Sequence, residues 1–364
     1  MKDKLNELKN FYKDKKILIT GHTGFKGVWL YEMLLNLGSK NITGISLDPN
    51  KENKISFLCS NNKFIKSYWC DIRDYSKIKS IIYDEKPNII FHLAAQSLVL
   101  DSYSNPFKTY TTNINGTLNI LEILKNTNFV NVFLNITTDK VYKNKEWIWG
   151  YRENEELFGF DPYSNSKSCV ELISQTYFNS FLKHKNITFA NIRAGNVIGG
   201  GDFSKNRIIP DSFFSIKNNK KMILRNPYST RPYQHVLEVI YFYVKLVQLI
   251  YKNKNLPTIY NIGPTDENIR NVDLVKLFFK KMDVKEVDNK LFFKNDNIFK
   301  TKESNLLKLD VSLIKEIFNW KPSFEINDAI NLTAEWYKNF LHNKINLEKV
   351  NQYHINFFLK KINW

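Results

Sequence analysis

The sequence predicts an α/β protein built on a doubly wound parallel sheet. Short apolar, β-branched runs alternate with segments of helical spacing over the first half of the chain. The run at 89–93, IIFHL, is almost continuously apolar, which is typical of strands buried on both faces. A glycine-rich turn directly follows the first expected strand. Together these features favour a parallel sheet with helices on both faces.

The expected elements follow in order along the chain. Residues 1–16 are charged and predict a short amphipathic helix with Leu5, Leu8, Phe11 and Tyr12 on one side. Strands are predicted at 16–20, 42–47, 64–69, 89–93, 130–136 and 187–192. Helices are predicted between them at 28–37, 75–84, 113–125 and 163–181. Beyond about residue 195 the pattern changes to loops, prolines and short elements.

Composition and charge exclude several classes of protein. The chain is 43% hydrophobic and 15% aromatic over 364 residues, as expected of a globular protein. It contains no apolar run of about 18 residues, so no membrane span is expected, and its charged N-terminus does not resemble a signal peptide. The net charge of +17 comes from lysines spread along the chain, which favours a solvated surface over nucleic-acid binding.

Cysteine and histidine usage points to a cytoplasmic protein that holds no metal. Cys59, Cys70 and Cys169 are odd in number and show no paired spacing, so we expect no disulfide framework. The six histidines do not combine with cysteine or with each other at zinc-ligand spacing.

The glycine-rich turn predicts a dinucleotide site. The sequence GHTGFKG has the spacing G-x-x-G-x-x-G, follows a strand and opens a helix. Glycines allow the backbone to turn tightly and to approach a pyrophosphate, which then lies at the positive N-terminus of the helix. In this context the motif favours a Rossmann-type cofactor site over an ordinary turn. The residues assigned to it are Gly21, Thr23, Gly24, Phe25, Lys26 and Gly27.

The second strand predicts NAD rather than NADP. An acidic residue about 20 positions after the glycines usually binds the adenosine ribose. Asp48 is the only carboxylate in that place, although Ser46 matches equally well by distance and Asp48 could simply begin a turn. Other cofactor contacts are expected after the third and fourth strands, at Asp71, Ile72, Ala94, Ala95 and Gln96.

A tyrosine and a lysine form the first part of a predicted catalytic site. Tyr163 and Lys167 are spaced i, i+4 and therefore share one helix face, where they would also contact the cofactor. A nearby ammonium stabilises a phenolate and lowers the pKa of a tyrosine, which can then take a proton from a sugar hydroxyl as hydride leaves the same carbon. Thr138, at the end of a central strand, can hydrogen-bond that hydroxyl.

An acid and an amine follow the threonine directly. Asp139 and Lys140 are expected where the parallel strands end, which is the usual position of the crevice in such sheets. Oxidation at C4 of a sugar acidifies the C5 proton. Lys140, if uncharged, could take that proton, and Asp139, if protonated, could protonate the departing C6 hydroxyl. In isolation the pair would be read as a polar loop.

These motifs resemble the extended short-chain dehydrogenase/reductase superfamily, and within it the CDP-glucose 4,6-dehydratases. The resemblance covers about residues 16–265 and includes TDK at 138, EWIWGYRE at 146, DPYSNSK at 161, RAGNVIGGGD at 193 and RNPYSTRPYQHV at 225. Related dehydratases that act on dTDP-glucose carry Asp-Glu where this chain has Asp139-Lys140. The chain departs from the family at Leu100, where the family usually has arginine.

The resemblance implies a substrate site and an assembly, and the change of pattern near residue 195 implies a domain division. Gln96, Asn196, Arg207 and Arg231 would hold the nucleotide sugar, with the arginines on phosphate oxygens. Residues 1–195 would form the NAD-binding Rossmann domain, to which 236–262 would return, and 196–364 would be mainly a substrate-binding region. A homodimer or homotetramer would form through the helices at 113–125 and 163–181.

The expected activity is conversion of CDP-D-glucose to CDP-4-dehydro-6-deoxy-D-glucose, feeding deoxysugar synthesis for surface polysaccharide. Two alternatives stay open at this stage. The chain could be another sugar-nucleotide 4,6-dehydratase or a 4-epimerase. It could also be a non-catalytic dinucleotide sensor, because a fold does not determine a function.

Overall fold

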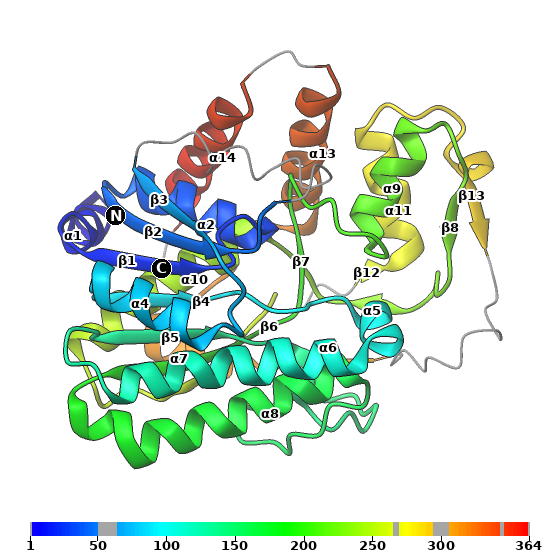
Figure 1. Cartoon of the computed structure of the whole chain (residues 1–364). Helices are drawn as coiled ribbons and strands as arrows, with labels where there is room; N and C mark the ends of the chain where they lie inside the picture. The colour runs from blue at the N-terminus through cyan, green and yellow to red at the C-terminus, as the bar shows by residue number, and fades with distance from the viewer. Residues whose placement is uncertain (1, 50–63, 265–268, 294–305, 343–345, 363–364) are drawn as a thin grey trace. The chain divides into compact units, whose positions relative to one another are not determined.

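The computed structural model describes the chain except residues 1, 50–63, 265–268, 294–305, 343–345 and 363–364 (Figure 1). The chain divides into two compact units. Unit 1 consists of Met1–Lys143, Glu153–Ala194 and Ile240–Asn261. Unit 2 consists of Asn144–Arg152, Gly195–Val239 and Ile262–Trp364. Residues 144–152 thus group with the second unit, although they precede the boundary expected near 195.

A seven-stranded sheet forms the centre of unit 1, in the order β11-β6-β5-β4-β1-β2-β3. Its strands are β1 (Lys16–Thr20), β2 (Asn41–Ser46), β3 (Ile65–Trp69), β4 (Ile89–His92), β5 (Val132–Ile136), β6 (Thr188–Ala194) and β11 (Ile259–Ile262). The five pairings that link β6 through to β3 are all parallel. The doubly wound parallel sheet predicted from the sequence is therefore confirmed.

The strand order identifies where this sheet can bind a ligand. β1 lies between β2 and β4, and the chain proceeds outward from β1 in both directions. Open α/β sheets bind ligands beyond the carboxyl ends of the strands at such a reversal. At the other edge, β11 follows α10 (Val236–Lys252) and adjoins β6, and the backbone N–H of Asn191 donates to the carbonyl of Thr258 at 2.8 Å.

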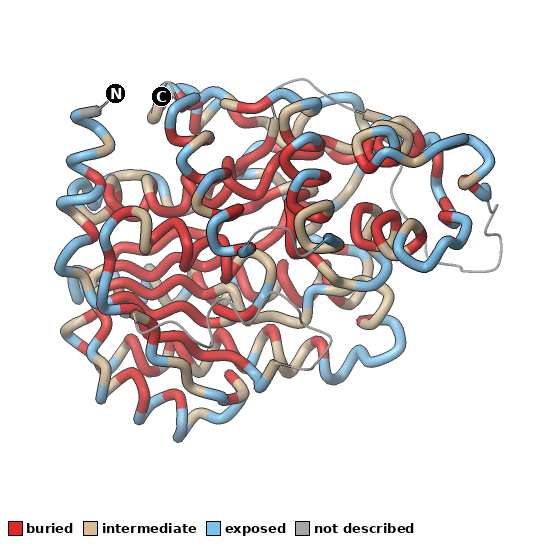
Figure 2. The backbone as a smooth tube through the Cα atoms, turned by 90° about the horizontal axis from the view of Figure 1, so that it is seen from above, coloured by how far each residue is buried: buried red, intermediate tan, exposed pale blue. Residues whose placement is uncertain are grey.

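Helices cover both faces of this sheet (Figure 1). One face packs on α4 (Tyr75–Glu85), α7 (Gly116–Lys125) and α8 (Pro162–Tyr177) through a core that includes Leu18, Ile45, Ile82, Leu121 and Phe133. Burial of each such side chain contributes about 1.5–3 kcal/mol. Figure 2 shows the strands as the most continuously buried part of the chain.

The helix α2 (Phe25–Asn36) lies on the opposite face of the sheet (Figure 1). The expected N-terminal amphipathic helix is α1 (Lys2–Tyr12). The Tyr12 hydroxyl donates to the carbonyl of Val244 in α10 at 2.7 Å. Smaller elements complete this unit: α5 (Val99–Ser104), α6 (Pro106–Tyr110), and the short helices η1 (Thr111–Asn115), η2 (Asp139–Val141), η3 (Phe178–Leu182) and η4 (Lys183–Lys185).

Unit 2 contains longer helices than the sequence pattern predicted. The expectation of loops and short elements after residue 195 is wrong for α9 (Ile208–Lys217), α11 (Asn271–Lys281), α13 (Ile326–His342) and α14 (Leu347–Lys361). The other elements are α12 (Ser312–Phe318), η5 (Val287–Lys290), β7 (Asn196–Ile198), β8 (Met222–Leu224), β9 (Thr230–Arg231), β10 (Tyr233–His235), β12 (Ile269–Arg270) and β13 (Leu291–Phe293). The strands form two-stranded pairs: β10 with β7, β12 with β9, and β13 with β8.

Aromatic packing holds the helices of unit 2 together. The Phe213 and Tyr337 rings stack with centroids 4.4 Å apart, which joins α9 to α13. A Cβ added at Gly200 would lie 1.9 Å from Cγ of Trp336, so only glycine allows this contact. The side-chain oxygen of Asn351 in α14 accepts a hydrogen bond from the Trp336 indole of α13 at 2.8 Å.

No helix in the described part of the chain is both long and apolar enough to span a membrane. Cys70 and Cys169 are free thiols, and Cys59 lies outside the described residues.

Candidate active site

The glycine-rich turn lies between β1 and the N-terminus of α2. Gly21 has φ +76° and its added Cβ would lie 2.9 Å from the backbone nitrogen of Ala94. A Cβ on Gly27 would lie 2.1 Å from the carbonyl oxygen of Gly21. Gly24 is exposed at the N-cap of α2 and makes no side-chain cap hydrogen bond. The turn therefore brings an uncapped helix N-terminus to the carboxyl end of β1, which fits a dinucleotide pyrophosphate.

The remaining residues of this turn have different surroundings. Thr23 is buried, and its backbone N–H donates to the Ser46 hydroxyl at 3.3 Å. Ser46 therefore shapes the glycine turn, whereas Asp48 is exposed two residues beyond the end of β2. Phe25 and Lys26 are half-buried in the first turn of α2. This placement leaves Asp48 as the accessible acid for a ribose.

Asp71 and Ile72, two of the expected cofactor contacts, follow β3. The Asp71 carboxylate accepts hydrogen bonds from the Arg73 guanidinium at 2.6–3.1 Å, and the Arg73 side chain holds the pKa of this carboxyl below its ordinary value. Ile72 is buried, and its side chain fills the space beside Gly116 of α7. The Asp71 carboxylate is thus paired with Arg73, and the Ile72 side chain is packed in the core.

The segment after β4 is tied down by a chain of polar side chains. The imidazole of His92 connects the hydroxyls of Thr20 at 2.7 Å and Thr117 at 3.0 Å. Asn113 binds the backbone of Gln96 in both directions and donates to the Ser166 hydroxyl at 2.8 Å. These bonds place the half-buried residues Ala94, Ala95 and Gln96 beside the glycine turn. The Gln96 side chain itself binds its own turn and the Thr109 hydroxyl, so it stabilises this segment.

The helix α8 begins one residue before Tyr163. Asp161 caps it, accepting from the backbone N–H of Ser164 at 3.0 Å, and Pro162 occupies the first helical position. This start places Tyr163 in the first turn and Lys167 one turn later on the same face. Tyr163 and Lys167 are 8% and 4% exposed, so both polar groups lie in largely buried surroundings.

Lys167 is anchored to the end of β5. Its ammonium donates to the carbonyl of Ile136 at 3.0 Å. Burial lowers the pKa of Lys167 to about 8, and the charge of Glu171 one turn further along opposes this shift. With this pKa the side chain is mainly an ammonium at neutral pH, the form that could stabilise a phenolate.

Thr138, Asp139 and Lys140 form a tight turn directly after β5. Thr138 and Asp139 are buried, and the Thr138 hydroxyl donates to a carboxylate oxygen of Asp139 at 3.0 Å. Lys140 is half-buried, and its backbone N–H donates to the Thr138 hydroxyl at 3.4 Å. The helix α8 packs on this turn. The structure thus brings the acid–amine pair to the helix that carries Tyr163 and Lys167.

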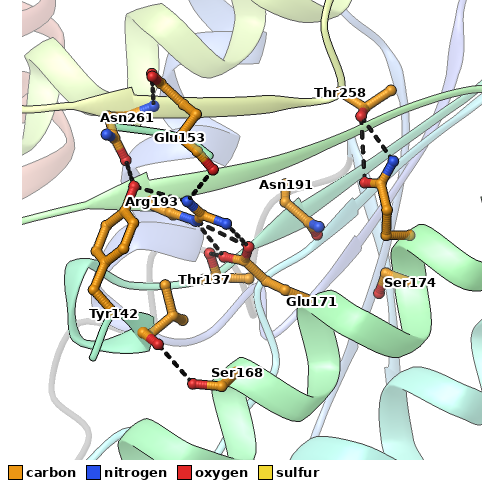
Figure 3. A network of polar contacts seen from close by, with 12 residues as sticks. Thr137, Tyr142, Glu153, Ser168, Glu171, Ser174, Asn191, Arg193, Thr258 and Asn261 are labelled. Carbon is orange, nitrogen blue, oxygen red and sulfur yellow. Dashed lines mark hydrogen bonds and ion pairs between the residues drawn. The ribbon is translucent and has the colours of Figure 1, made fainter. Parts of the chain in front are cut away.

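A buried ion pair behind this turn was missed from the sequence (Figure 3). Glu171 and Arg193 are each 1% exposed and lie 2.5 Å apart. Two signals could have indicated them: Glu171 continues the i, i+4 series of Tyr163 and Lys167, and Arg193 is the one charged residue of β6.

Of the four residues that the resemblance assigned to the substrate, Gln96 lies in unit 1, after β4, and the other three lie in unit 2. Asn196 begins β7. Arg207 is the N-cap residue of α9, and its guanidinium lies 2.9 Å from the buried carboxylate of Asp202. Arg231 ends β9 and donates to the carbonyl of Thr230 at 2.9 Å. Asp202 is therefore a further residue that orients a candidate phosphate-binding arginine.

The model of one protein family, described as GDP-mannose 4,6 dehydratase, matches residues 18–333. The chain belongs to this family. The match spans both units and includes all the candidate residues above. The family assignment agrees with the predicted resemblance to nucleotide-sugar dehydratases of the short-chain dehydrogenase/reductase type.

Individual relatives differ in how much they add to this family assignment. A CDP-glucose 4,6-dehydratase of Salmonella typhimurium is 40% identical over 336 residues, which cover 91% of this chain and 92% of the relative. A dTDP-glucose 4,6-dehydratase structure from Streptomyces venezuelae has a TM-score of 0.77 at 19% identity and covers 89% of this chain and 97% of its own. A UDP-glucose 4-epimerase structure from Thermotoga maritima has a TM-score of 0.76 at 21% identity, with coverage of 90% and 99%. The fold is therefore common to dehydratases and epimerases and does not separate them.

Proposed function

We propose that this protein is an NAD-dependent CDP-glucose 4,6-dehydratase. It converts CDP-D-glucose to CDP-4-dehydro-6-deoxy-D-glucose with loss of one water. The observation that carries the proposal is the Thr138-Asp139-Lys140 turn packed against the helix of Tyr163 and Lys167. An epimerase needs only the threonine, tyrosine and lysine, whereas elimination also needs an acid and a base. The 40% identical relative supports CDP-glucose as the substrate.

The cofactor would be held by the glycine turn, the uncapped N-terminus of α2 and the exposed Asp48. A carboxylate at that place binds a ribose 2′-hydroxyl and repels a 2′-phosphate, which favours NAD over NADP. When bound, NAD supplies an acceptor for the C4 hydride and returns the same hydride to C6.

The side chains divide the proton transfers among them. Tyr163 removes the proton of the C4 hydroxyl while Lys167 provides positive charge beside it, and Thr138 hydrogen-bonds the same hydroxyl. The C4 ketone that results acidifies the C5 proton, which Lys140 takes in its uncharged form. Asp139, in its protonated form, then protonates the C6 hydroxyl, which leaves as water and leaves a C5–C6 double bond. Lys140 would return its proton to C5 as C6 receives the hydride, which saturates this bond. The cofactor ends in its starting oxidation state, so the net reaction is a dehydration.

The substrate nucleotide would be bound by unit 2, through Asn196, Arg207 and Arg231. Arginine suits this task because its planar fork binds phosphate oxygens in pairs. Arg207 is already oriented by Asp202 at 2.9 Å and keeps more than a third of its side chain exposed. Residues 1–195 with 236–262 would act as the NAD-binding domain, and the rest of the chain mainly as the substrate-binding region.

The first experiment is incubation of the protein with NAD and a panel of nucleotide sugars, followed by mass spectrometry. We expect CDP-glucose to lose the mass of one water, with weaker or no reaction of dTDP-, UDP- and GDP-sugars. An epimerase would give an isomer of unchanged mass, which chromatography separates. A dinucleotide sensor would bind NAD and leave every sugar intact. Either of these last two outcomes would overturn the proposal.

We also propose that the protein works in the cytoplasm as a homodimer or homotetramer. Free Cys70 and Cys169 suit a reducing compartment. The helices expected to pair carry exposed apolar side chains: Leu172 of α8 is 56% exposed and Phe181 of η3 is 38% exposed. A second copy packing on α8 would bury Leu172.

The oligomeric proposal predicts that Leu172→Glu gives a monomer. A carboxylate on the shared helix face would be desolvated without a partner in the assembly, which costs several kcal/mol. Light scattering of the variant would then report a single chain, and that of the native protein at least two. Leu47→Glu is the matched control, because Leu47 is equally exposed at 63% but lies after β2. A native protein that is already monomeric would contradict the proposal.

A further inference from the structure

Three side chains of α8 hold the turn that carries Asp139 and Lys140. Lys167 donates to the carbonyl of Ile136 at 3.0 Å, before the turn. The Ser168 hydroxyl donates to the carbonyl of Val141 at 2.8 Å, at its end. Glu171 accepts from the Thr137 hydroxyl at 2.5 Å (Figure 3). Side chains of α8 therefore hydrogen-bond this segment at both ends.

The buried ion pair between Glu171 and Arg193 adds further contacts to this segment. Arg193 forks onto Glu171, with Nε 3.0 and 2.9 Å from the two carboxylate oxygens. The other arm of the guanidinium, Nη1, donates to the Tyr142 hydroxyl at 2.7 Å and to the carbonyl of Glu153 at 2.9 Å. Through Glu171 the ion pair binds Thr137, which precedes the turn. Through Arg193 it binds Tyr142, which follows the turn (Figure 3).

Tyr142 is held from two further sides. Its hydroxyl donates to the Asn261 amide oxygen at 2.7 Å, and its ring lies 4.6 Å from the Arg193 guanidinium carbon. The backbone N–H of Asn261 donates to a carboxylate oxygen of Glu153 at 2.9 Å, which closes the network. Side chains from β6 and β11 therefore converge on this one residue.

Tyr142 and Arg193 each stay in one protonation state over the pH range in which an enzyme works. Burial raises the pKa of the Tyr142 hydroxyl well above its ordinary value, so the hydroxyl remains a donor. Burial alone would lower the pKa of the Arg193 guanidinium, but Glu171 and Tyr142 hold it above its ordinary value. The groups are therefore suited to holding a geometry and not to exchanging protons.

We propose that Glu171, Arg193 and Tyr142 are positioning residues for the elimination step, because they set the placement of the Asp139-Lys140 turn. The inference rests on the proposed dehydratase function. Tyr163 has a separate support, since α8 begins at the Asp161 cap and carries Tyr163 in its own first turn. Loosening the network should therefore displace the acid and base while the tyrosine keeps its place.

The test is Tyr142→Phe, which removes the hydroxyl and keeps the buried ring. We expect the elimination step to slow by roughly 10- to 100-fold, since displacements near 1 Å can cost that much. The preceding oxidation at C4 should slow clearly less than elimination does, because Tyr163 and Lys167 keep their places on α8 and only Thr138 shares the loosened turn. Single-turnover samples quenched with borodeuteride would then contain more C4-deuterated hexose relative to 6-deoxyhexose than the native protein gives.

A second readout needs no turnover. Hydrogen–deuterium exchange of a peptide covering 137–142 should speed up in Tyr142→Phe, because its amides rely on the held turn. Tyr177→Phe is the matched control: Tyr177 is on the same helix, and its hydroxyl donates to Glu122 at 3.1 Å, outside the network. Both the product ratio and the exchange should be unchanged in that variant.

Arg193→Lys provides an independent variant that keeps the charge. A lysine ammonium cannot fork onto Glu171 and also reach Tyr142, so the same shift in product ratio is expected. If Tyr142→Phe slows oxidation and elimination equally, or leaves 137–142 exchange unchanged, the positioning role is wrong. If the native protein dehydrates no nucleotide sugar, the proposed function fails, and exchange still decides whether the network holds the turn.

Discussion

Replacing Tyr163 by phenylalanine is expected to lower the oxidation of CDP-glucose by roughly 100- to 10,000-fold, the range for loss of a general acid–base group. Tyr163 is the proposed proton acceptor for the C4 hydroxyl, and it shares its helix face with Lys167. The buried ring remains, so the fold should lose only about 1 kcal/mol of stability from the missing hydroxyl.

Deuterium placed at C4 of the substrate provides the measurement for Tyr163→Phe. In the native protein the label should move from C4 to C6 of the product, whereas the variant should leave it at C4. Tyr177→Phe, a hydroxyl deletion on the same helix, should behave as the native protein does. Label transfer at more than about a tenth of the native rate would remove Tyr163 from its proposed role, since a lost general base costs 100-fold or more.

Replacing Lys140 by alanine is expected to separate the two halves of the reaction. Oxidation at C4 depends on Tyr163, Lys167 and Thr138, so it should continue. Removal of the C5 proton has no other proposed base, so dehydration should fall by at least about 100-fold. The variant would then accumulate a 4-keto sugar that retains its C6 hydroxyl, detectable by borodeuteride trapping and mass spectrometry.

Lys143→Ala is the matched control for Lys140→Ala. Lys143 lies three residues further along, with its side chain half exposed and 3.0 Å from Glu156. Its loss removes a surface ion pair worth less than about 1 kcal/mol and should not alter product ratio. Full dehydration by Lys140→Ala would show that another group takes the C5 proton. Asp139 would then be the next residue to test as that base.

The sheet and its glycine turn were predictable because they depend on local patterns. The apolar runs at 16–20 and 89–93 correspond closely to β1 (Lys16–Thr20) and β4 (Ile89–His92). Strands buried on both faces must be apolar throughout, and a turn in which Gly21 has positive φ and lies against Ala94 leaves no room for a side chain. Such constraints act on neighbouring residues and are therefore visible in the sequence.

The candidate site was predictable to a smaller extent. The i, i+4 spacing of Tyr163 and Lys167 indicates a shared face, and the order of residues after β5 indicates a turn. The sequence did not distinguish Ser46 from Asp48, because both lie near the end of β2. The structure separates them: the Ser46 hydroxyl accepts from the backbone of Thr23, whereas Asp48 is exposed.

The chain's own sequence determined the fold class, the position of the cofactor turn, and the grouping of an acid and an amine after a central strand. It did so because strand burial, glycine turns and helix spacing are local. Only the tertiary structure decided what holds the Thr138-Asp139-Lys140 turn. Glu171, Arg193, Tyr142 and Asn261 are far apart in sequence, and their buried charges and hydroxyls must find partners across the sheet. Which partners meet depends on strand order, which no local pattern specifies.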